Sequence, residues 1–281
     1  MLGTSTFSLK KILLPVDFSE RCAAVVPMAV EFARHFGAEL TFLHMASLFP
    51  DRALPDSLCL RLDAFCSDAL GNVTPGRRIL MSDRDPAADI ADYAQRHATD
   101  LIMMPTHGYG PFRRFLFGSV TLKVLHDAQC AVWTTAHTEE QPDFRSIAFR
   151  NVLCAIDRSE QSCRLLKWAA QFADEYGAKL TIVHAIPSVS ASYGRLNVPG
   201  WEEELAESPQ FEIASLRDML GIKAKIKVVP GDPAPAVRQA AEEEQADLLV
   251  IGRSRGDGLA GRLLTDTFPI IRLSPCPVVS V

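Results

Sequence analysis

The sequence lacks the features that define several common classes of protein. No apolar run approaches the roughly 20 residues that a membrane-spanning helix needs. The net charge is -5, so the chain lacks the basic excess of a general nucleic-acid binder. The first residues, MLGTSTFSLKKILLPVD, contain neither the apolar core nor the cleavage site of a signal peptide. We therefore expect a cytoplasmic protein that binds neither membranes nor nucleic acids.

The seven cysteines follow no recognisable pattern. No C-x-x-C pair and no Cys/His cluster with zinc spacing occurs, so we predict no metal site. In a reducing cytoplasm most of the cysteines would act as small buried hydrophobic residues. Redox sensing by one of them is the alternative.

Sequence motifs of common enzymes are absent as well. The chain has no G-x-x-x-x-G-K-[ST] phosphate loop, no G-x-S-x-G elbow and no H-E-x-x-H zinc motif. His44 and His184 occupy equivalent strand ends, and duplicated residues of this kind are more often structural than catalytic. We therefore predict no catalytic residue.

The chain does contain one unit written twice. The run KKILLPVDFSERC, which begins at Lys10, returns as RNVLCAIDRSEQSC from Arg150, and Asp17 and Asp157 are 140 residues apart. RDPAADIADYAQRHATDLIMM is likewise matched by GDPAPAVRQAAEEEQADLLVI, with an offset of 147. At 281 residues, 48% of them apolar, the chain is long enough for two cores. We predict a domain over residues 1–136, a linker over 137–147 and a second domain over 148–281.

Each copy alternates strands and helices. In the first copy, continuous apolar runs predict buried strands, and helical periodicity with capping residues predicts the helices. Ser19 and Gly37 are the expected caps of the first helix, and Pro86 opens a later one. The expected strands are 11–16, 39–45, 78–81, 101–104 and 131–135, and the expected helices are 19–37, 58–70, 86–97 and 118–127. This order predicts an α/β, Rossmann-like fold: two tandem open parallel sheets with helices on both faces.

In such sheets, ligands bind beyond the carboxyl ends of the strands, where the strand order reverses. In the first copy that edge gathers Asp17, Met45 and the loop 106–119. In the second copy it gathers Asp157 and Ala185, with the loop 253–264.

The stretch GDGLAG, residues 256–261, matches the dinucleotide-binding pattern G-x-G-x-x-G. However, it follows the fourth strand of its unit, whereas the dinucleotide fingerprint follows the first. No acidic residue stands roughly 20 positions later, as the fingerprint requires. We interpret the match as a coincidence in a glycine-rich loop.

Three motifs together resemble the universal stress protein family. They are a strand ending in I-L-x-P-x-D, a strand ending in L-H, and H-G followed by nine residues and G-S-V. The resemblance covers nearly the whole chain, twice, and implies the adenine-nucleotide alpha hydrolase-like version of the α/β fold. In that family the branch with G-x-x-G, nine residues and G-[ST] binds ATP, and the other branch does not. Members are usually dimers, and tandem members pack their halves as an internal pseudo-dimer, which leaves a further homodimer open.

The first copy keeps most of that ATP signature. It reads Pro105-Thr-His-Gly108, nine residues, then Gly118-Ser119, so proline replaces the first glycine. Gly118 and Ser119 begin a helix, whose free N–H groups and positive dipole end favour an anion. Pro105 removes an N–H group at the expected ribose contact. The resemblance implies an ATP site, with or without Mg²⁺, that is formed by Asp17, Met45, Pro105, Gly108, Gly118, Ser119 and Val120.

The second copy keeps only the first glycine of the signature. It reads Gly252-Arg-Ser-Arg255, nine residues, then Thr265-Asp266. A carboxylate at Asp266 would repel a polyphosphate, so we predict no nucleotide in this domain. The arginines of this region, Arg253, Arg255 and Arg262, leave open the binding of a smaller anion.

The sequence thus supports a stress-response module that binds ATP in the first domain with little or no hydrolysis. A second hypothesis is an interaction scaffold that works without nucleotide. A third is slow ATP hydrolysis assisted by Arg113 and Arg114, although we favour the interpretation of these residues as solvated loop charges. Asp17 could also serve only as a cap of the turn that contains Ser19.

Overall fold

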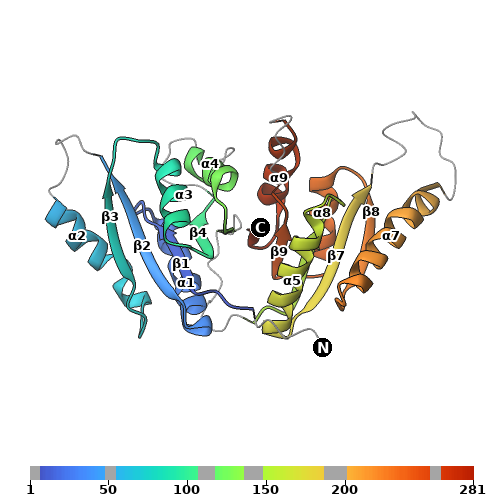
Figure 1. Ribbon diagram of the computed structural model, residues 1–281, viewed down its shortest axis with the longest axis horizontal. Coiled ribbons are helices and arrows are strands. Elements are labelled where there is room, and N and C mark those ends of the chain that lie inside the picture. Colours follow the sequence, from blue (N-terminus) through green and yellow to red (C-terminus); the bar gives the residue numbers. More distant parts are fainter. Residues whose placement is uncertain (1–6, 48–54, 107–117, 136–147, 187–200, 254–260) are drawn as a thin grey trace. The chain divides into compact units, whose positions relative to one another are not determined.

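The computed structural model describes residues 7–47, 55–106, 118–135, 148–186, 201–253 and 261–281, and only the backbone of residues 55, 201–206 and 261–266. The chain divides into two compact units (Figure 1). The first domain spans Ser8–Ile147 and the second spans Ala148–Val281. Phe7 groups with the second domain, although it precedes the first in the sequence.

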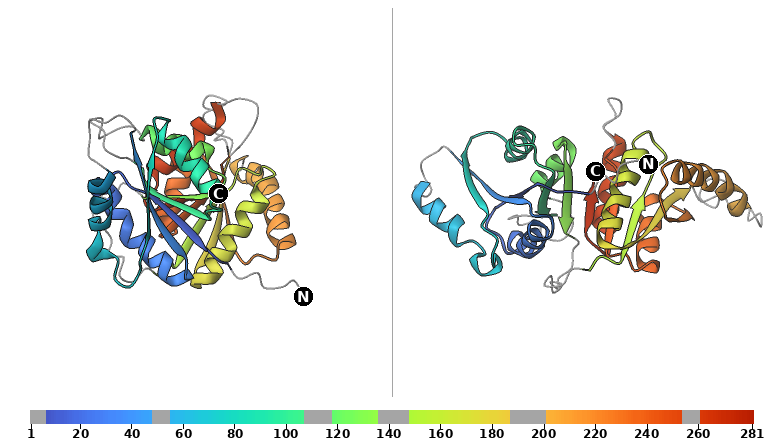
Figure 2. Two further views of the ribbon diagram at one scale, coloured as in Figure 1. Left: turned by 60° about the vertical axis from the view of Figure 1, so that its left-hand side comes forward. Right: turned by 60° about the horizontal axis from the view of Figure 1, so that its bottom comes forward.

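The first domain is a five-stranded parallel sheet with the strand order β3-β2-β1-β4-β5. Its elements are β1 (Lys11–Pro15), α1 (Glu20–Phe36), β2 (Glu39–Ala46), α2 (Pro55–Ala64), the 3₁₀ helix η1 (Ser67–Ala69), β3 (Gly76–Met81), α3 (Pro86–Arg96), β4 (Leu101–Pro105), α4 (Ser119–Asp127) and β5 (Ala131–Thr135). Right-handed crossovers place α1 and α2 on one face of the sheet and α3 and α4 on the other. Figure 2 shows helices on both faces of the sheet, which confirms the predicted α/β class.

The second domain repeats this arrangement with the strand order β8-β7-β6-β9-β10. Its elements are β6 (Asn151–Ala155), α5 (Ser162–Tyr176), β7 (Lys179–Ile186), α7 (Trp201–Met219), β8 (Lys225–Pro230), α8 (Pro233–Glu243), β9 (Leu248–Ile251), α9 (Gly261–Leu273) and β10 (Val278–Ser280). The pairing of the central strands agrees with the sequence offsets of 140 and 147 residues between the two copies. Ile12 pairs with Leu101 in the first domain, and Val152 pairs with Leu248 in the second.

Local sequence fixes the ends of α1 as predicted. The Ser19 side chain accepts a hydrogen bond from the Cys22 backbone N–H, which satisfies one of the free donors of the first turn. Gly37 ends the helix with a φ of 63°, a left-handed conformation that glycine adopts without a steric penalty. Gly177 ends α5 in the same way.

The apolar runs form the sheets because both faces of each sheet are covered. Ile12, Leu13 and Leu14 in β1 are at most 1% exposed, so successive residues are buried on opposite faces. The largest fully buried side chain is that of Trp133 in β5, which packs edge-on against Phe32 at 5.1 Å. The predicted strands therefore need no alternation of polar and apolar residues.

The two domains also share a pair of hydrogen bonds at the amino ends of their central strands. The Asp100 carboxylate accepts hydrogen bonds from the backbone N–H groups of Lys10 and Lys11. Asp247 makes the same pair of contacts with Arg150 and Asn151. Residues that keep their role in both copies stabilise the fold, which directs the search for function to positions where the copies differ.

Phe7 packs on the second domain. Its ring meets those of Trp168 and Phe172, both on α5, edge-on at centroid distances of 5.2 and 5.7 Å. Phe149 extends the group through Phe172 at 5.1 Å. This aromatic cluster ties Phe7 to α5.

The cysteines are less uniformly buried than the sequence suggested. Cys22, Cys154 and Cys276 are buried, Cys59 is exposed, and the other three are intermediate. The prediction that most cysteines lie in the core is therefore wrong: Cys59 lies on the exposed side of α2, and Cys66, Cys130 and Cys163 lie near helix or strand ends. All seven are free thiols.

Burial protects some of these thiols from reaction. It raises the pKa of Cys22 and of Cys276 to about 12, because the thiolate would lose its hydration. We expect Cys59 to react with iodoacetamide at pH 8 at least about tenfold faster than Cys22 or Cys276 in the folded protein. Peptide mapping by mass spectrometry after timed quenching measures this order, and the urea-unfolded protein, in which the rates should converge, is the control.

No helix in the described part of the chain is both long and apolar enough to cross a membrane.

Candidate nucleotide site

The sheet topology brings the predicted site residues of the first domain to one edge. β1 lies between β2 and β4, and the strand order reverses between β1 and β4. Asp17 follows β1, Met45 lies near the end of β2, and Pro105 ends β4. The carboxyl ends of parallel strands share one edge, so these three residues lie at the switch point where ligands of such sheets bind.

Asp17 organises the turn between β1 and α1. Its Oδ1 accepts hydrogen bonds from the Ser19 backbone N–H at 2.9 Å and from Ser19 Oγ at 2.6 Å. Asp157 accepts the equivalent backbone bond from Ser159 at 2.9 Å. The capping role that the sequence left as an alternative is therefore present in both domains. Asp17 is nevertheless exposed, which leaves room for a ligand contact through the rest of its carboxylate.

The residue after each of these aspartates has a left-handed backbone. Phe18 has a φ of 60° and Arg158 one of 61°, which costs about 1–2 kcal/mol for a residue with a Cβ. Both side chains also contact a neighbouring helix. The Arg61 guanidinium of α2 lies 4.1 Å above the Phe18 ring, and Arg158 Nη1 pairs with Glu212 Oε2 of α7 at 2.7 Å. The turn is thereby connected to α2 in the first domain and to α7 in the second.

The two strand-end histidines make equivalent contacts in the two domains. His44 Nδ1 lies 2.7 Å from the Val16 carbonyl oxygen, and His184 Nδ1 lies 2.8 Å from that of Ile156. A carbonyl oxygen only accepts, so Nδ1 carries the proton in each case. Both histidines join the end of one strand to the end of its neighbour. The His44 ring also contacts Phe18 at 4.6 Å.

Pro105 is part of the sheet and supports α4. It is buried at the end of β4, where it pairs in register with Thr135 of β5. Its carbonyl oxygen accepts a hydrogen bond from Thr121 Oγ at 3.1 Å, which connects the strand to the first turn of α4. Having no N–H group, Pro105 can offer a ligand only its carbonyl and ring.

α4 begins as predicted, with Gly118 as its N-cap. One detail differs from the expectation: the Gly118 N–H is already donated to the Thr106 carbonyl oxygen, at 3.1 Å. The donors left by helix geometry are those of Ser119, Val120 and Thr121, because no helical carbonyl precedes them. Ser119 is exposed. These three amides and the Ser119 hydroxyl are the donors that this helix end presents to an anion.

An ion pair on the exposed face holds α4 in place. Lys123 Nζ on α4 pairs with the carboxylate of Asp85, the N-cap of α3. The hydrogen bond from Lys123 lowers the pKa of Asp85 below its ordinary value, so the carboxylate is charged at neutral pH. α4 is thereby anchored at both Thr121 and Lys123, which gives the amide donors of its first turn a defined position.

Part of the predicted site lies outside the described residues. This applies to Gly108, His107, Arg113 and Arg114, and to most of the GDGLAG stretch. Among the described residues, no group of three or more His, Cys, Asp or Glu residues could hold a metal ion.

The second domain differs from the first at the positions that would contact phosphate. α9 begins at Gly261, so Thr265 and Asp266 lie in the second turn of this helix. The expected loop 253–264 is therefore wrong over residues 261–264, which belong to α9. Compared with α4, α9 has four additional helical residues, 261–264, at its start.

The fold and this arrangement define a tandem protein of two parallel α/β domains. The sequence profile of the Universal stress protein family matches residues 8–135 and again residues 148–281. The chain belongs to this family and carries two of its domains in tandem.

Several relatives agree with this assignment. A Thermus aquaticus protein named universal stress protein in QAH/OAS sulfhydrylase 3'region is 34% identical over 141 residues, which cover 47% of this chain and 98% of the relative. A universal stress protein of Methanocaldococcus jannaschii is 30% identical over 135 residues, covering 44% of this chain and 79% of the relative. The crystal structure of a universal stress protein from Archaeoglobus fulgidus matches over 97% of this chain and 96% of its own, with 24% identity and a TM-score of 0.68. The last comparison shows the shared fold over both domains.

Proposed function

We propose that the first domain binds ATP at the switch point between β1 and β4, with little or no hydrolysis, and that the protein acts as a nucleotide-responsive module. The observation that carries this proposal is the start of α4. Three first-turn amides and the exposed Ser119 hydroxyl lie at the start of α4, which is held to the residue after β4 at the carboxyl edge where Asp17 and Met45 also lie. A helix of this kind favours the negative charge of a polyphosphate. Gly108 completes the proposed site.

The contacts of Asp17 support binding rather than catalysis. Its Oδ1 is committed to Ser19, and the same contact recurs at Asp157 in the second domain. The proposal gives the remaining oxygen of this carboxylate a contact to the nucleotide and assigns Asp17 no role as a general base. We therefore expect ATP to remain intact when it is bound with Mg²⁺, as measured by phosphate release over a buffer control.

The proposal leaves the second domain without nucleotide. Asp266 corresponds to Ser119 in the sequence, and a carboxylate at this position would repel a polyphosphate. α9 also starts one turn earlier than α4 does, so its first amides occupy a different place in the sequence.

A scaffold that works without nucleotide is the competing function. Two observations favour it: Pro105 presents no N–H group, and the Gly118 N–H is already bonded to Thr106. Isothermal titration of nucleotide-free protein with ATP distinguishes the two functions. We expect saturable binding of one ATP per chain, and an absence of heat over several temperatures would favour the scaffold.

A further inference from the structure

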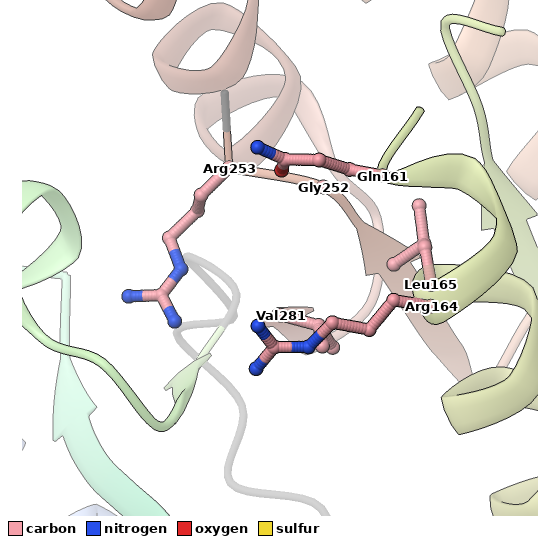
Figure 3. A pocket seen from close by; sticks show the side chains of 6 residues that line it. All are labelled: Gln161, Arg164, Leu165, Gly252, Arg253 and Val281. Atoms are coloured by element: carbon pink, nitrogen blue, oxygen red, sulfur yellow. The ribbon is translucent and has the colours of Figure 1, made fainter. Parts of the chain in front are cut away.

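A small pocket lies at the carboxyl edge of the second domain, on the face that α5 covers (Figure 3). It has a volume of about 120 Å³. It is formed by the first residues of α5, the residues that follow β9 and the residue that follows β10, namely Gln161, Arg164, Leu165, Gly252, Arg253 and Val281. The Arg253 backbone N–H donates to the Val281 carbonyl oxygen at 3.3 Å, which fixes the pocket wall between the two strand ends.

The lining of this pocket is positively charged. Two of its six residues are arginines, one contributes a neutral amide, and none has an acidic side chain; the main-chain carboxyl group of Val281 is the one negative group of this lining, so the two guanidinium groups leave a positive balance. Figure 3 shows the side chains of Arg164 and Arg253 extending to the same side of the pocket. Arg253 is only 4% exposed, so its charge acts in surroundings from which water is largely excluded. Arg164 is exposed and makes no ion pair with any residue that the structure describes.

The start of α5 adds to this potential. Gln161 is its N-cap, and its side chain makes no capping hydrogen bond. In α1, Ser19 Oγ accepts the hydrogen bond of the Cys22 N–H, and the corresponding N–H of α5, that of Ser162, is donated to the Ser159 carbonyl oxygen at 3.0 Å. The start of α5 therefore leaves the N–H groups of Cys163 and Arg164 as donors next to the pocket, and α1 leaves the same number.

The charge is particular to the second domain. By the offsets of 140 and 147 residues, Arg164 corresponds to Ala24 and Arg253 to Thr106. The β-strand registers support both offsets. The first domain keeps the same turn and the same helix without these two cations, so the scaffold of the fold does not require them.

We propose that this pocket is a binding site for an oxyanion of the size of phosphate, held by the guanidinium groups of Arg164 and Arg253. A planar guanidinium donates two parallel hydrogen bonds to such an anion. The volume accommodates a tetrahedral anion together with water, since one water occupies about 30 Å³ in the liquid. The second domain would then bind a small anion and the first a nucleotide, and anion binding in the second domain does not require nucleotide binding in the first.

Titration of the ¹⁵N-labelled full chain with inorganic phosphate, at constant ionic strength, tests the proposal. We expect saturable shifts of the backbone amides of Gly252 and Arg253. Arg164→Ala should weaken this binding about tenfold, because it removes charge-assisted hydrogen bonds. Arg164 is exposed, so the variant should remain folded, whereas replacement of the buried Arg253 could unfold the domain.

Two variants serve as matched controls. Lys167→Ala removes a positive charge from an exposed position of α5 that does not line the pocket, and it should leave the phosphate titration unchanged. Gly118→Val alters the helix start of the first domain and should also leave it unchanged. The proposal is overturned if no saturable shift occurs, if the shifts are confined to residues 118–121, or if Arg164→Ala and Lys167→Ala behave alike.

Discussion

Replacing Gly118 by valine is expected to weaken ATP binding about a hundredfold, because the loss of two charge-assisted hydrogen bonds to phosphate is an effect of this size. The valine side chain would stand beside the first amides of α4, where the phosphate must approach. The backbone itself should not change. Gly118 has a φ of -60° and a ψ of 134°, an extended conformation that valine adopts readily. The variant thus separates access to the helix end from the fold of the domain.

Titration calorimetry and thermal unfolding together measure this effect. The duplication supplies a matched control, because Thr265 in α9 corresponds to Gly118 in the sequence. Thr265→Val should leave ATP binding unchanged. Equal affinity of the wild type and Gly118→Val would place the nucleotide elsewhere, and an equal loss in both variants would point to an indirect effect.

The second large effect is expected at Asp17. Asp17→Ala should reduce ATP affinity about ten- to hundredfold, because a charged acceptor beside the adenosine would be lost. It should also lower stability by about 1 kcal/mol, since the Ser19 N–H and hydroxyl lose their acceptor.

Asp157→Ala is the natural control for that variant. It removes the same backbone contact, from Ser159, in a domain for which we propose no nucleotide. We expect a similar loss of stability in chemical denaturation and no loss of ATP affinity. If both variants bind ATP like the wild type, Asp17 has only the structural role that its twin has.

Much of the fold could be predicted because its determinants are local. Ser19 and Gly37 mark the ends of α1 through side-chain capping and left-handed backbone, and both properties belong to single residues. The apolar strands could be located for the same reason, since burial on both faces leaves an unbroken run. Because the two halves align in sequence, each helix or strand predicted in one half could also be predicted in the other.

Features that depend on tertiary contacts could not be read in this way. The bond from Gly118 N–H to Thr106 joins the two ends of a loop, and no sequence pattern encodes it. The start of α9 was misplaced because the alignment with α4 ignores the helical residues before Thr265. The pocket at Arg164 was not predicted, because an arginine on an amphipathic helix is usually a solvent-exposed residue. The sequence difference that could have drawn attention to it is the alanine, Ala24, at the corresponding position of the first copy.

The position of Phe7 has a consequence for anyone who dissects this protein. A fragment that starts at residue 148 would leave behind an aromatic ring that sits against Trp168 and Phe172. Such a truncated half would expose part of the α5 surface to water and invite self-association. Keeping the isolated second half native calls for a fragment in which the segment with Phe7 is grafted back ahead of residue 148.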